Sequence, residues 1–496
     1  MNPDVYEGFI KSAQLLSLLA TCIGSFIGLI VGMIPGMTIS AGIIIVLPLT
    51  FVLPPSISIS LLLGLYAGGM MGGSFSAILL KIPGTPSASA TALDGYPMAN
   101  SGKADIALST AIISSFLGGL FSFICLYFIA PELAEIALSF RAPDLFSLVF
   151  FGLSVICSFA TKSIIKGLLS GIIGLLFVSI GQDPVMGTER FTFGNPDLLS
   201  GVHFLTALIG LFAIPQLADN LSNSVKNFNH KTKNSKIKEL LPSLKNLKII
   251  KYPVCIGSFL GTFIGILPGA GGPIAAFISY DYAKKISKNP KQFGQGCVEG
   301  IAAPESANNA VCGGALIPMM TLGIPGDPVT AILIGALLVH GLAPGPLLFM
   351  EQAPFAYSVI FSFFWANLFN LLIAMSTLPL LIKLLRTPKS ILLPIIAVLC
   401  VVGSFALRNS FFDVYIMFAF GLLGLFMKWL DMPVVPLLLA LVLGKQLEEH
   451  LRIALTSSQG DISIFFTSPI SIFFLCLSAI SILWPMFFRR RKKHSI

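Results

Sequence analysis

Residues 24–36 read Gly-Ser-Phe-Ile-Gly-Leu-Ile-Val-Gly-Met-Ile-Pro-Gly, and residues 257–269 read Gly-Ser-Phe-Leu-Gly-Thr-Phe-Ile-Gly-Ile-Leu-Pro-Gly. Seven of the thirteen positions are identical, and the alignment needs no gap. A second motif recurs in the same order: Gly72-Gly73 followed by Ile82-Pro83-Gly84 reappears as Gly313-Gly314 followed by Ile324-Pro325-Gly326. The chain therefore contains two halves that descend from one unit.

The composition places both halves in a membrane. Of the 496 residues, 55% are hydrophobic and 11% are charged, and the mean hydropathy is +0.89. A soluble globular protein carries about 25% charged residues, so that class is excluded. Runs such as 198–217 and 390–407 are apolar on every face, unlike the alternating strands of an outer-membrane barrel. We expect an all-α polytopic membrane protein with about 11–12 crossings.

Both halves follow the same plan along the sequence. Each begins with an apolar hairpin broken at Pro-Gly (12–53 and 252–283) and continues as a glycine-rich span that runs into a second Pro-Gly break. We expect the segments after those second breaks (82–93 and 324–339) to be re-entrant, and four more apolar segments to follow in each half. An odd number of crossings per half inverts the second half relative to the first. Inverted repeats with broken helices are typical of secondary transporters.

Basic residues set the predicted orientation. Residues 226–251, 284–291, 383–389 and 489–493 hold 20 of the 31 Lys and Arg residues. Such segments face the cytoplasm, which places the N-terminus outside and the C-terminus inside. A polybasic patch on anionic lipid is compatible with this orientation. The predicted units are membrane repeat 1 (1–217), a basic cytoplasmic loop (218–251), membrane repeat 2 (252–447), an external loop with the last span (448–488) and a basic cytoplasmic tail (489–496).

Glycines recur every four residues at the start of each half. Gly24, Gly28 and Gly32 share one helix face, and residues 257, 261 and 265 repeat the pattern. Small residues at this spacing let two membrane helices approach closely, so we expect each set to be a packing seam.

The four matched Pro-Gly breaks are the predicted functional positions. An ordinary proline kink explains one break but explains four matched ones poorly. A broken helix leaves a half-helix N-terminus that can hold a carboxylate, and its unwound carbonyls can coordinate Na⁺. The candidate substrate- or ion-binding residues lie at or beside the breaks: Pro35, Gly36, Pro83, Gly84, Thr85, Ser87, Ser89, Pro268, Gly269, Gly271, Glu305, Asn308, Asn309, Pro325, Gly326 and Asp327.

The polar members of this set allow two interpretations each. The hydroxyls of Thr85, Ser87 and Ser89 could donate to an anion or complete an ion's oxygen shell, or they could bond back to their own helix. Glu305 and its neighbouring amides could face a cavity at membrane depth, where unpaired polar groups are costly, or could form a wet helix cap in the headgroup layer. Asp327 is a candidate for proton or cation coupling.

Longer motifs resemble one known family. Residues 72–86, continuing to Leu93-Asp-Gly-Tyr-Pro-Met98 and Gly102, resemble the signature of the large membrane subunit of tripartite tricarboxylate transporters, the TctA family. Residues 299–310, 322–326 and 341–346 resemble that family too.

The resemblance implies a function and partners. It implies a bacterial inner-membrane, multi-pass permease that takes up di- or tricarboxylates such as citrate by symport with Na⁺ or H⁺, without another cofactor. It also implies a periplasmic solute-binding protein and a small four-span membrane subunit. A passive anion channel and an intramembrane enzyme stay open as alternatives, the second with Ser74 or Ser76 beside His203 or His340.

Overall fold

The structure is a computed structural model that describes residues 3–34, 37–159, 163–183, 187–222, 244–269, 271–384 and 389–491. The described chain is almost entirely helical, and its one pair of strands has two residues in each strand. The all-α expectation is therefore confirmed. Most of the predicted basic loop, 223–243, and the last five residues of the tail lie outside the described residues.

Nine α-helices lie within the described residues of the first half. They are α1 (Pro3–Ala13), α2 (Leu15–Met33), α3 (Ile39–Thr50), α4 (Pro55–Leu80), α5 (Ala92–Met98), α6 (Ala104–Leu138), α7 (Ala142–Phe159), α8 (Ile164–Val178) and α9 (Phe204–Ser222). Shorter elements connect them: the 3-10 helices η1 (Pro86–Ser89) and η3 (Pro196–Leu198), the π-helix η2 (Ala99–Lys103), and the strands β1 (Gly181–Gln182) and β2 (Glu189–Arg190).

The second half repeats the order of long and short helices. Its elements are α10 (Leu244–Ile266), α11 (Gly271–Ile286), η4 (Pro290–Gln292), α12 (Glu299–Leu322), α13 (Pro328–Val339), α14 (Pro346–Glu351), α15 (Ala353–Leu384), α16 (Lys389–Ala406), α17 (Phe411–Trp429) and α18 (Val435–Ser457). The 3-10 helix η5 (Ile462–Phe466) and α19 (Pro469–Arg491) end the described chain.

Six helices within the described ranges are long and apolar enough to cross a membrane. They are Leu15–Met33, Pro55–Leu80, Ala92–Leu138, Lys248–Ile266, Ala353–Thr377 and Phe411–Trp429, and seven further apolar helices have 10–17 residues. The chain is therefore a multi-pass membrane protein. The exact number of crossings, the boundaries of the units and the side on which each terminus lies stay predictions.

The two glycine seams are confirmed as sites of close helix packing. In the first half α2 lies along α4, and a Cβ added at Gly28 would lie 2.4 Å from the Leu65 carbonyl oxygen. In the second half α10 lies along α12, and a Cβ at Gly261 would lie 2.3 Å from the Ala307 carbonyl oxygen. The other four seam glycines meet backbone oxygens in the same way: Gly24, Gly32, Gly257 and Gly265. Only glycine allows the backbones to come this close.

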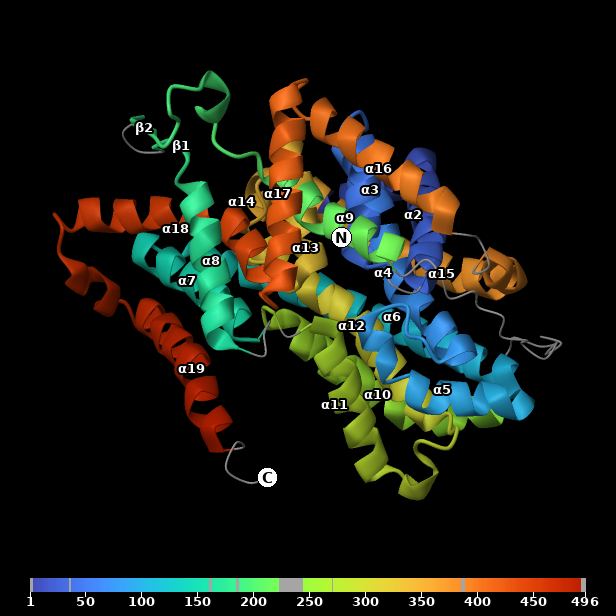
Figure 1. The fold of residues 1–496 in the computed structure, drawn as a ribbon. Coiled ribbons are helices and arrows are strands. Elements are labelled where there is room, and N and C mark those ends of the chain that lie inside the picture. Colours follow the sequence, from blue (N-terminus) through green and yellow to red (C-terminus); the bar gives the residue numbers. More distant parts are fainter. Residues whose placement is uncertain are drawn as a thin grey trace.

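Helices of the two halves are exchanged reciprocally. The helix α6 of the first half packs on α12 and α10 of the second half, whereas α15 of the second half packs on α4 and α2 of the first. Further along, α9 packs on α17 and α8 packs on α18. In Figure 1, α7, α8, α18 and α19 gather on one side of the molecule, away from α5 and α10–α12. Each half therefore contributes helices that pack against the other half, while the duplication itself and the inversion of the second half stay predictions.

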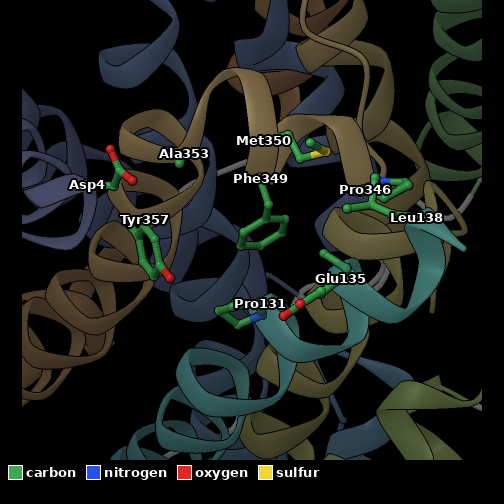
Figure 2. A pocket seen from close by; sticks show the side chains of 10 residues that line it. Asp4, Pro131, Glu135, Leu138, Pro346, Phe349, Met350, Ala353 and Tyr357 are labelled. Carbon is green, nitrogen blue, oxygen red and sulfur yellow. The ribbon is translucent and has the colours of Figure 1, made fainter. Parts of the chain in front are cut away.

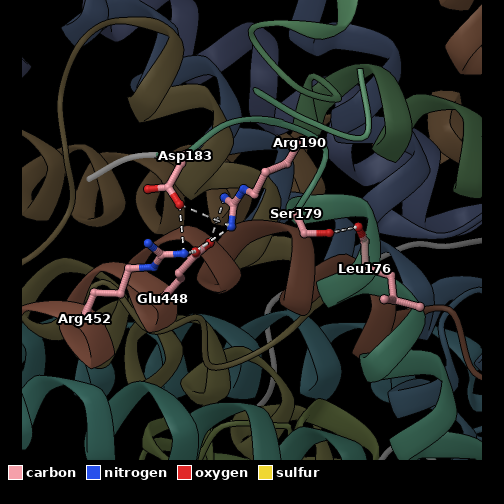
Figure 3. A network of polar contacts seen from close by, with 6 residues as sticks. All are labelled: Leu176, Ser179, Asp183, Arg190, Glu448 and Arg452. Atoms are coloured by element: carbon pink, nitrogen blue, oxygen red, sulfur yellow. Dashed lines mark hydrogen bonds and ion pairs between the residues drawn. The ribbon is translucent and has the colours of Figure 1, made fainter. Parts of the chain in front are cut away.

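The helix α18 extends further than the apolar pattern indicates. The sequence predicts that membrane repeat 2 ends at residue 447 and that an external loop begins at residue 448, but the helix continues to Ser457. Its polar extension carries Glu448 and Arg452, which form a four-residue ion-pair network with Asp183 and Arg190 beside the β1–β2 pair (Figure 3). The Arg452 Nη2 to Asp183 Oδ2 distance is 2.8 Å, and the Arg190 Nη1 to Glu448 Oε1 distance is 2.7 Å. These contacts stabilise a helical continuation that hydropathy does not reveal.

The seam makes a direct prediction about stability. Replacing Gly28 by Ala places a methyl group against the Leu65 carbonyl, so α2 and α4 must move apart. We expect a loss of about 1–3 kcal/mol in the free energy of unfolding, the usual range for overpacking, and an equal effect for Gly261→Ala. The control Ile23→Val changes a 54% exposed side chain of α2 and should have little effect. If wild type and both glycine variants gave equal thermal unfolding curves in detergent, close packing at these glycines would not contribute to stability as predicted.

Candidate functional site

The first described break folds back onto the seam of its own half. After α4 ends, the Gly84 N–H donates to the Gly73 carbonyl at 3.2 Å. A Cβ on Gly84 would lie 1.9 Å from the Gly32 carbonyl oxygen, so the break lies directly against the end of α2. Gly73 in turn leaves room for Thr85, whose Oγ1 would lie 2.3 Å from a Cβ at that position.

The second half repeats this arrangement. A Cβ on Gly326 would lie 2.7 Å from the Gly265 carbonyl oxygen and 2.7 Å from the Ala315 Cα. The Gly326 carbonyl also accepts a hydrogen bond from the Gly269 N–H at 2.9 Å, so the two breaks of this half touch each other. The matched breaks therefore adopt matched positions against the third glycine of each seam.

Polar groups from both halves meet at the first break. Thr85 and Ser87 are each 3% exposed, and their hydroxyl oxygens lie 3.2 Å apart. A Cβ on Gly272, at the start of α11, would lie 3.1 Å from Asn308 Oδ1 and 3.4 Å from Ser87 Oγ. Asn308 Oδ1 and Ser87 Oγ therefore both lie next to Gly272, at the start of α11. We call Thr85, Ser87, the 271–272 backbone and Asn308 the inter-half site.

A hydrogen bond from its amide nitrogen sets the orientation of the Asn308 side chain. Its Nδ2 donates to the Met70 carbonyl of α4 at 3.0 Å, and the side chain is fully buried. Its Oδ1 has no hydrogen-bond partner in the described part of the protein. A buried amide oxygen without a donor costs about 1–3 kcal/mol, so this oxygen is available to a donor on a ligand.

The electrostatic character of the inter-half site comes from a helix terminus. The 16-residue helix α11 begins at Gly271, whose φ of +65° is suited to glycine. The first N–H groups of a helix have no partner within that helix, and its dipole places positive potential at this end. Pro273 lacks an N–H, so the donors of the first turn come from the two glycines before it. Together with two hydroxyls, this arrangement suits a carboxylate.

Asp327 has a capping role in the structure. Its Oδ1 accepts from the Thr330 N–H at 2.7 Å, and the Thr330 hydroxyl contacts the Asp327 backbone, which completes a capping box at the start of α13. Its Oδ2 accepts from the Tyr66 hydroxyl of α4 at 2.5 Å. Asp327 therefore ties the second break to the central helix of the first half. Sequence reasoning missed Tyr66, because nothing in the glycine-rich pattern distinguishes it from a core aromatic.

Glu305 lies one turn before Asn308 on α12 and is fully buried. Its Oε1 accepts from the Thr91 hydroxyl at 2.5 Å, and its Oε2 accepts from the Ser115 hydroxyl of α6 at 2.9 Å. The wet helix cap considered for this segment is therefore wrong, since Glu305, Asn308 and Asn309 are all buried in the protein. The Asn309 Oδ1 also has no partner among the described residues.

The remaining predicted residues do not converge on the inter-half site. Pro35 and Gly36 lie outside the described residues. Ser89 ends η1 and is half-buried. The three other break prolines, Pro83, Pro268 and Pro325, each directly precede a break glycine.

Asp94 is a buried anchor that the sequence did not single out as a site residue. Its Oδ1 accepts from the backbone N–H groups of Gly294, Gly296 and Cys297 at 2.8–2.9 Å, and its Oδ2 accepts from the Tyr280 hydroxyl at 2.8 Å. The side chain has no exposed surface. It fastens α5, which follows the first break, to α11 and to the loop before α12. The only signal for it was its place in the motif at residues 93–98.

One cavity opens at a distance from the breaks. It has a volume of about 200 Å³ and lies where α1, the end of α6, α14 and the start of α15 meet (Figure 2). Asp4, Glu135 and Tyr357 supply its polar lining, and none of the break residues contributes to it. Among the described residues no group of three or more His, Cys, Asp or Glu side chains could hold a metal ion.

Comparisons with known proteins agree with the motifs. A model of the tripartite tricarboxylate transporter TctA family matches residues 18–439. The chain is 39% identical over 432 residues to an uncharacterised 52.8 kDa protein in the TAR-I ttuC′ 3′ region of Agrobacterium vitis, covering 87% of this chain and 86% of that protein. It is 40% identical over 223 residues to an uncharacterised protein in the TAR-II ttuC′ 3′ region of the same organism, covering 45% of this chain and 92% of that protein. No solved structure matches the chain.

The Asp94 anchor can be tested by substitution. Asp94→Ala leaves three backbone N–H groups and the Tyr280 hydroxyl without an acceptor, so we expect a loss of about 3 kcal/mol in stability, as for hydrogen bonds to a buried charge. Limited proteolysis should then cut the 290–297 loop faster. Asp105→Ala, a half-buried carboxylate in the first turn of α6, is the matched control. Unchanged cleavage in Asp94→Ala would show that the loop does not depend on this carboxylate.

Proposed function

Because the chain belongs to the TctA family of tripartite tricarboxylate transporters, we propose that it is the permease subunit of a binding-protein-dependent importer of di- or tricarboxylates. Transport is driven by an ion gradient and proceeds by elevator-like or rocking alternating access. The chain lies in the bacterial inner membrane and works with a periplasmic solute-binding protein and a small four-span membrane subunit.

The convergence at the inter-half site carries this proposal. Two hydroxyls from the first break, the start of α11 and an unpaired amide oxygen of α12 come from segments far apart in sequence. Hydroxyl and backbone donors at a helix N-terminus suit a carboxylate, and the Asn308 oxygen can accept from a donor elsewhere on the same ligand. Residues buried to this degree reach solvent only if the halves move, which favours a carrier over an open channel.

The alternative functions have weaker support. An intramembrane enzyme would need a Ser–His pair, but the Ser74 and Ser76 hydroxyls donate to backbone carbonyls of their own helix α4. The Nδ1 of His203 has no hydrogen-bond partner in the described part of the chain, so no such bond joins it to either serine. A passive anion channel would need a permeable path past the buried inter-half site.

Counterflow in proteoliposomes separates these functions. We expect the full-length protein to exchange external labelled citrate for internal unlabelled citrate faster than it fills empty vesicles. A channel would show no acceleration by internal substrate, and an enzyme would show neither activity. No acceleration with any acid of a di- and tricarboxylate panel, with the binding protein and the small membrane subunit both present, would contradict the proposed function.

Substitutions at the inter-half site test its location. Ser87→Ala removes one donor to the bound carboxylate, and a loss of about 1.5 kcal/mol corresponds to a roughly tenfold higher half-saturation concentration in counterflow. Asn308→Ala should raise it by a similar factor, because its unpaired oxygen is removed. Ser101→Ala is the matched control, since that exposed hydroxyl donates to the nearby Met98 carbonyl. An unchanged half-saturation concentration in both site variants would place the substrate elsewhere.

A further inference from the structure

Glu305 occupies a hydroxyl-lined position inside the protein core. The Thr91 hydroxyl, just before α5, and the Ser115 hydroxyl of α6 each donate to one of its carboxylate oxygens. The Ser74 hydroxyl of α4 also interacts with the carboxylate. The carboxylate thus lies between elements of both halves and has no exposed surface.

No positive charge faces this carboxylate in the described part of the protein. The ion pairs of the described residues do not include Glu305. Two other buried acids lie on elements packed against α12, and both accept hydrogen bonds from other groups. Asp94 accepts from the Tyr280 hydroxyl and from backbone N–H groups, and Asp327 accepts from the Tyr66 hydroxyl. The charged groups of the neighbouring helices α6, α10, α11 and α14 lie toward the helix ends: Asp105, Glu132, Glu135, Lys248, Lys251, Asp281, Lys284, Lys285 and Glu351. An ionised carboxylate in this environment is strongly disfavoured without a compensating proton or cation.

The distances favour a proton over a metal cation. The contacts of 2.5 and 2.9 Å between hydroxyl and carboxylate oxygens are those of shared hydrogens. A cation the size of Ca²⁺ or Na⁺ binds oxygens at about 2.3–2.6 Å and holds its ligand oxygens further apart than these pairs. No such space exists between Glu305 and its two donors.

We propose that Glu305 is the coupling-proton site of this transporter, an inference that rests on the proposed carrier function. On the outer side a proton from water adds to a carboxylate oxygen of Glu305 and forms a neutral acid. On the inner side that O–H bond breaks, the proton passes to the cytoplasm, and the carboxylate is restored. One proton crosses with each cycle.

One short segment of the chain links Glu305 to the inter-half site. Thr91, which donates to the ionised form of Glu305, belongs to the same 82–93 segment as Thr85 and Ser87 of the inter-half site. On the other side, Glu305 and Asn308 are three residues apart on one helix face of α12. The Thr91 and Ser115 hydroxyls donate to different oxygens of Glu305, so a proton that adds to Oε1 displaces the hydrogen bond from Thr91 and one that adds to Oε2 displaces that from Ser115. Protonation at Oε1 therefore changes the segment that carries the hydroxyls of the inter-half site.

The test compares proton-driven accumulation with exchange. Full-length protein in proteoliposomes is given labelled citrate under an inward pH gradient, and accumulation is divided by the counterflow rate of the same preparation. Glu305→Gln, which keeps the shape and cannot ionise, should lower this ratio at least tenfold. Glu135→Gln, a surface carboxylate at the end of α6, should leave it unchanged. An unchanged ratio in Glu305→Gln, or accumulation driven by a Na⁺ gradient at constant pH, would overturn the proposal.

A second measurement does not depend on transport. Infrared difference spectra of the purified protein across a pH titration should contain a protonated-carboxyl band that is missing in Glu305→Gln. The band should titrate at a different pH in Thr91→Val, because one of the two hydrogen-bond donors is lost. If wild type shows no counterflow, the proposed function fails and the infrared band alone decides the protonation of Glu305. A spectrum without a Glu305-dependent band overturns the inference.

Discussion

The fold depends on backbone-to-backbone contact along two pairs of helices. Because the seam glycines have no side chain, α2 lies against the carbonyls of α4, and α10 lies against those of α12. The same contact determines where the breaks lie, since Gly84 packs on Gly32 and Gly326 packs near Gly265. A larger residue in either seam would move the break as well as the helix. Stability and site geometry therefore rest on one packing constraint.

The reciprocal exchange of helices explains how the site draws on both halves. The apolar window of α4 is entirely buried, and this helix touches the second half through Tyr66 and Met70. The helix α12 touches the first half through Glu305, which bonds to Thr91 and Ser115. Polar groups that would be costly in lipid are placed in this interior. Motion of one half against the other would change all of these contacts together, as alternating access requires.

The sequence predicted the features that local patterns encode. The four-residue spacing of glycines predicted the seams, and the matched Pro-Gly pairs indicated where the chain breaks. The hydroxyls of Thr85 and Ser87 were candidates for ligand donors, and both lie beside α11 and Asn308 in the structure. What local patterns could not show were contacts between distant segments. The Asp94 anchor joins residues about two hundred positions apart, and the polar end of α18 is stabilised by ion pairs with a distant loop.

The central claim is that a carboxylate binds where the first break meets α11 and α12. An experimental structure of the full-length protein with bound citrate tests it most directly. We expect ligand density within hydrogen-bond distance of Ser87 Oγ and the 271–272 backbone, next to Asn308 Oδ1. Citrate density in the cavity beside Tyr357, with no ligand density in the inter-half site, would contradict this location of the binding site.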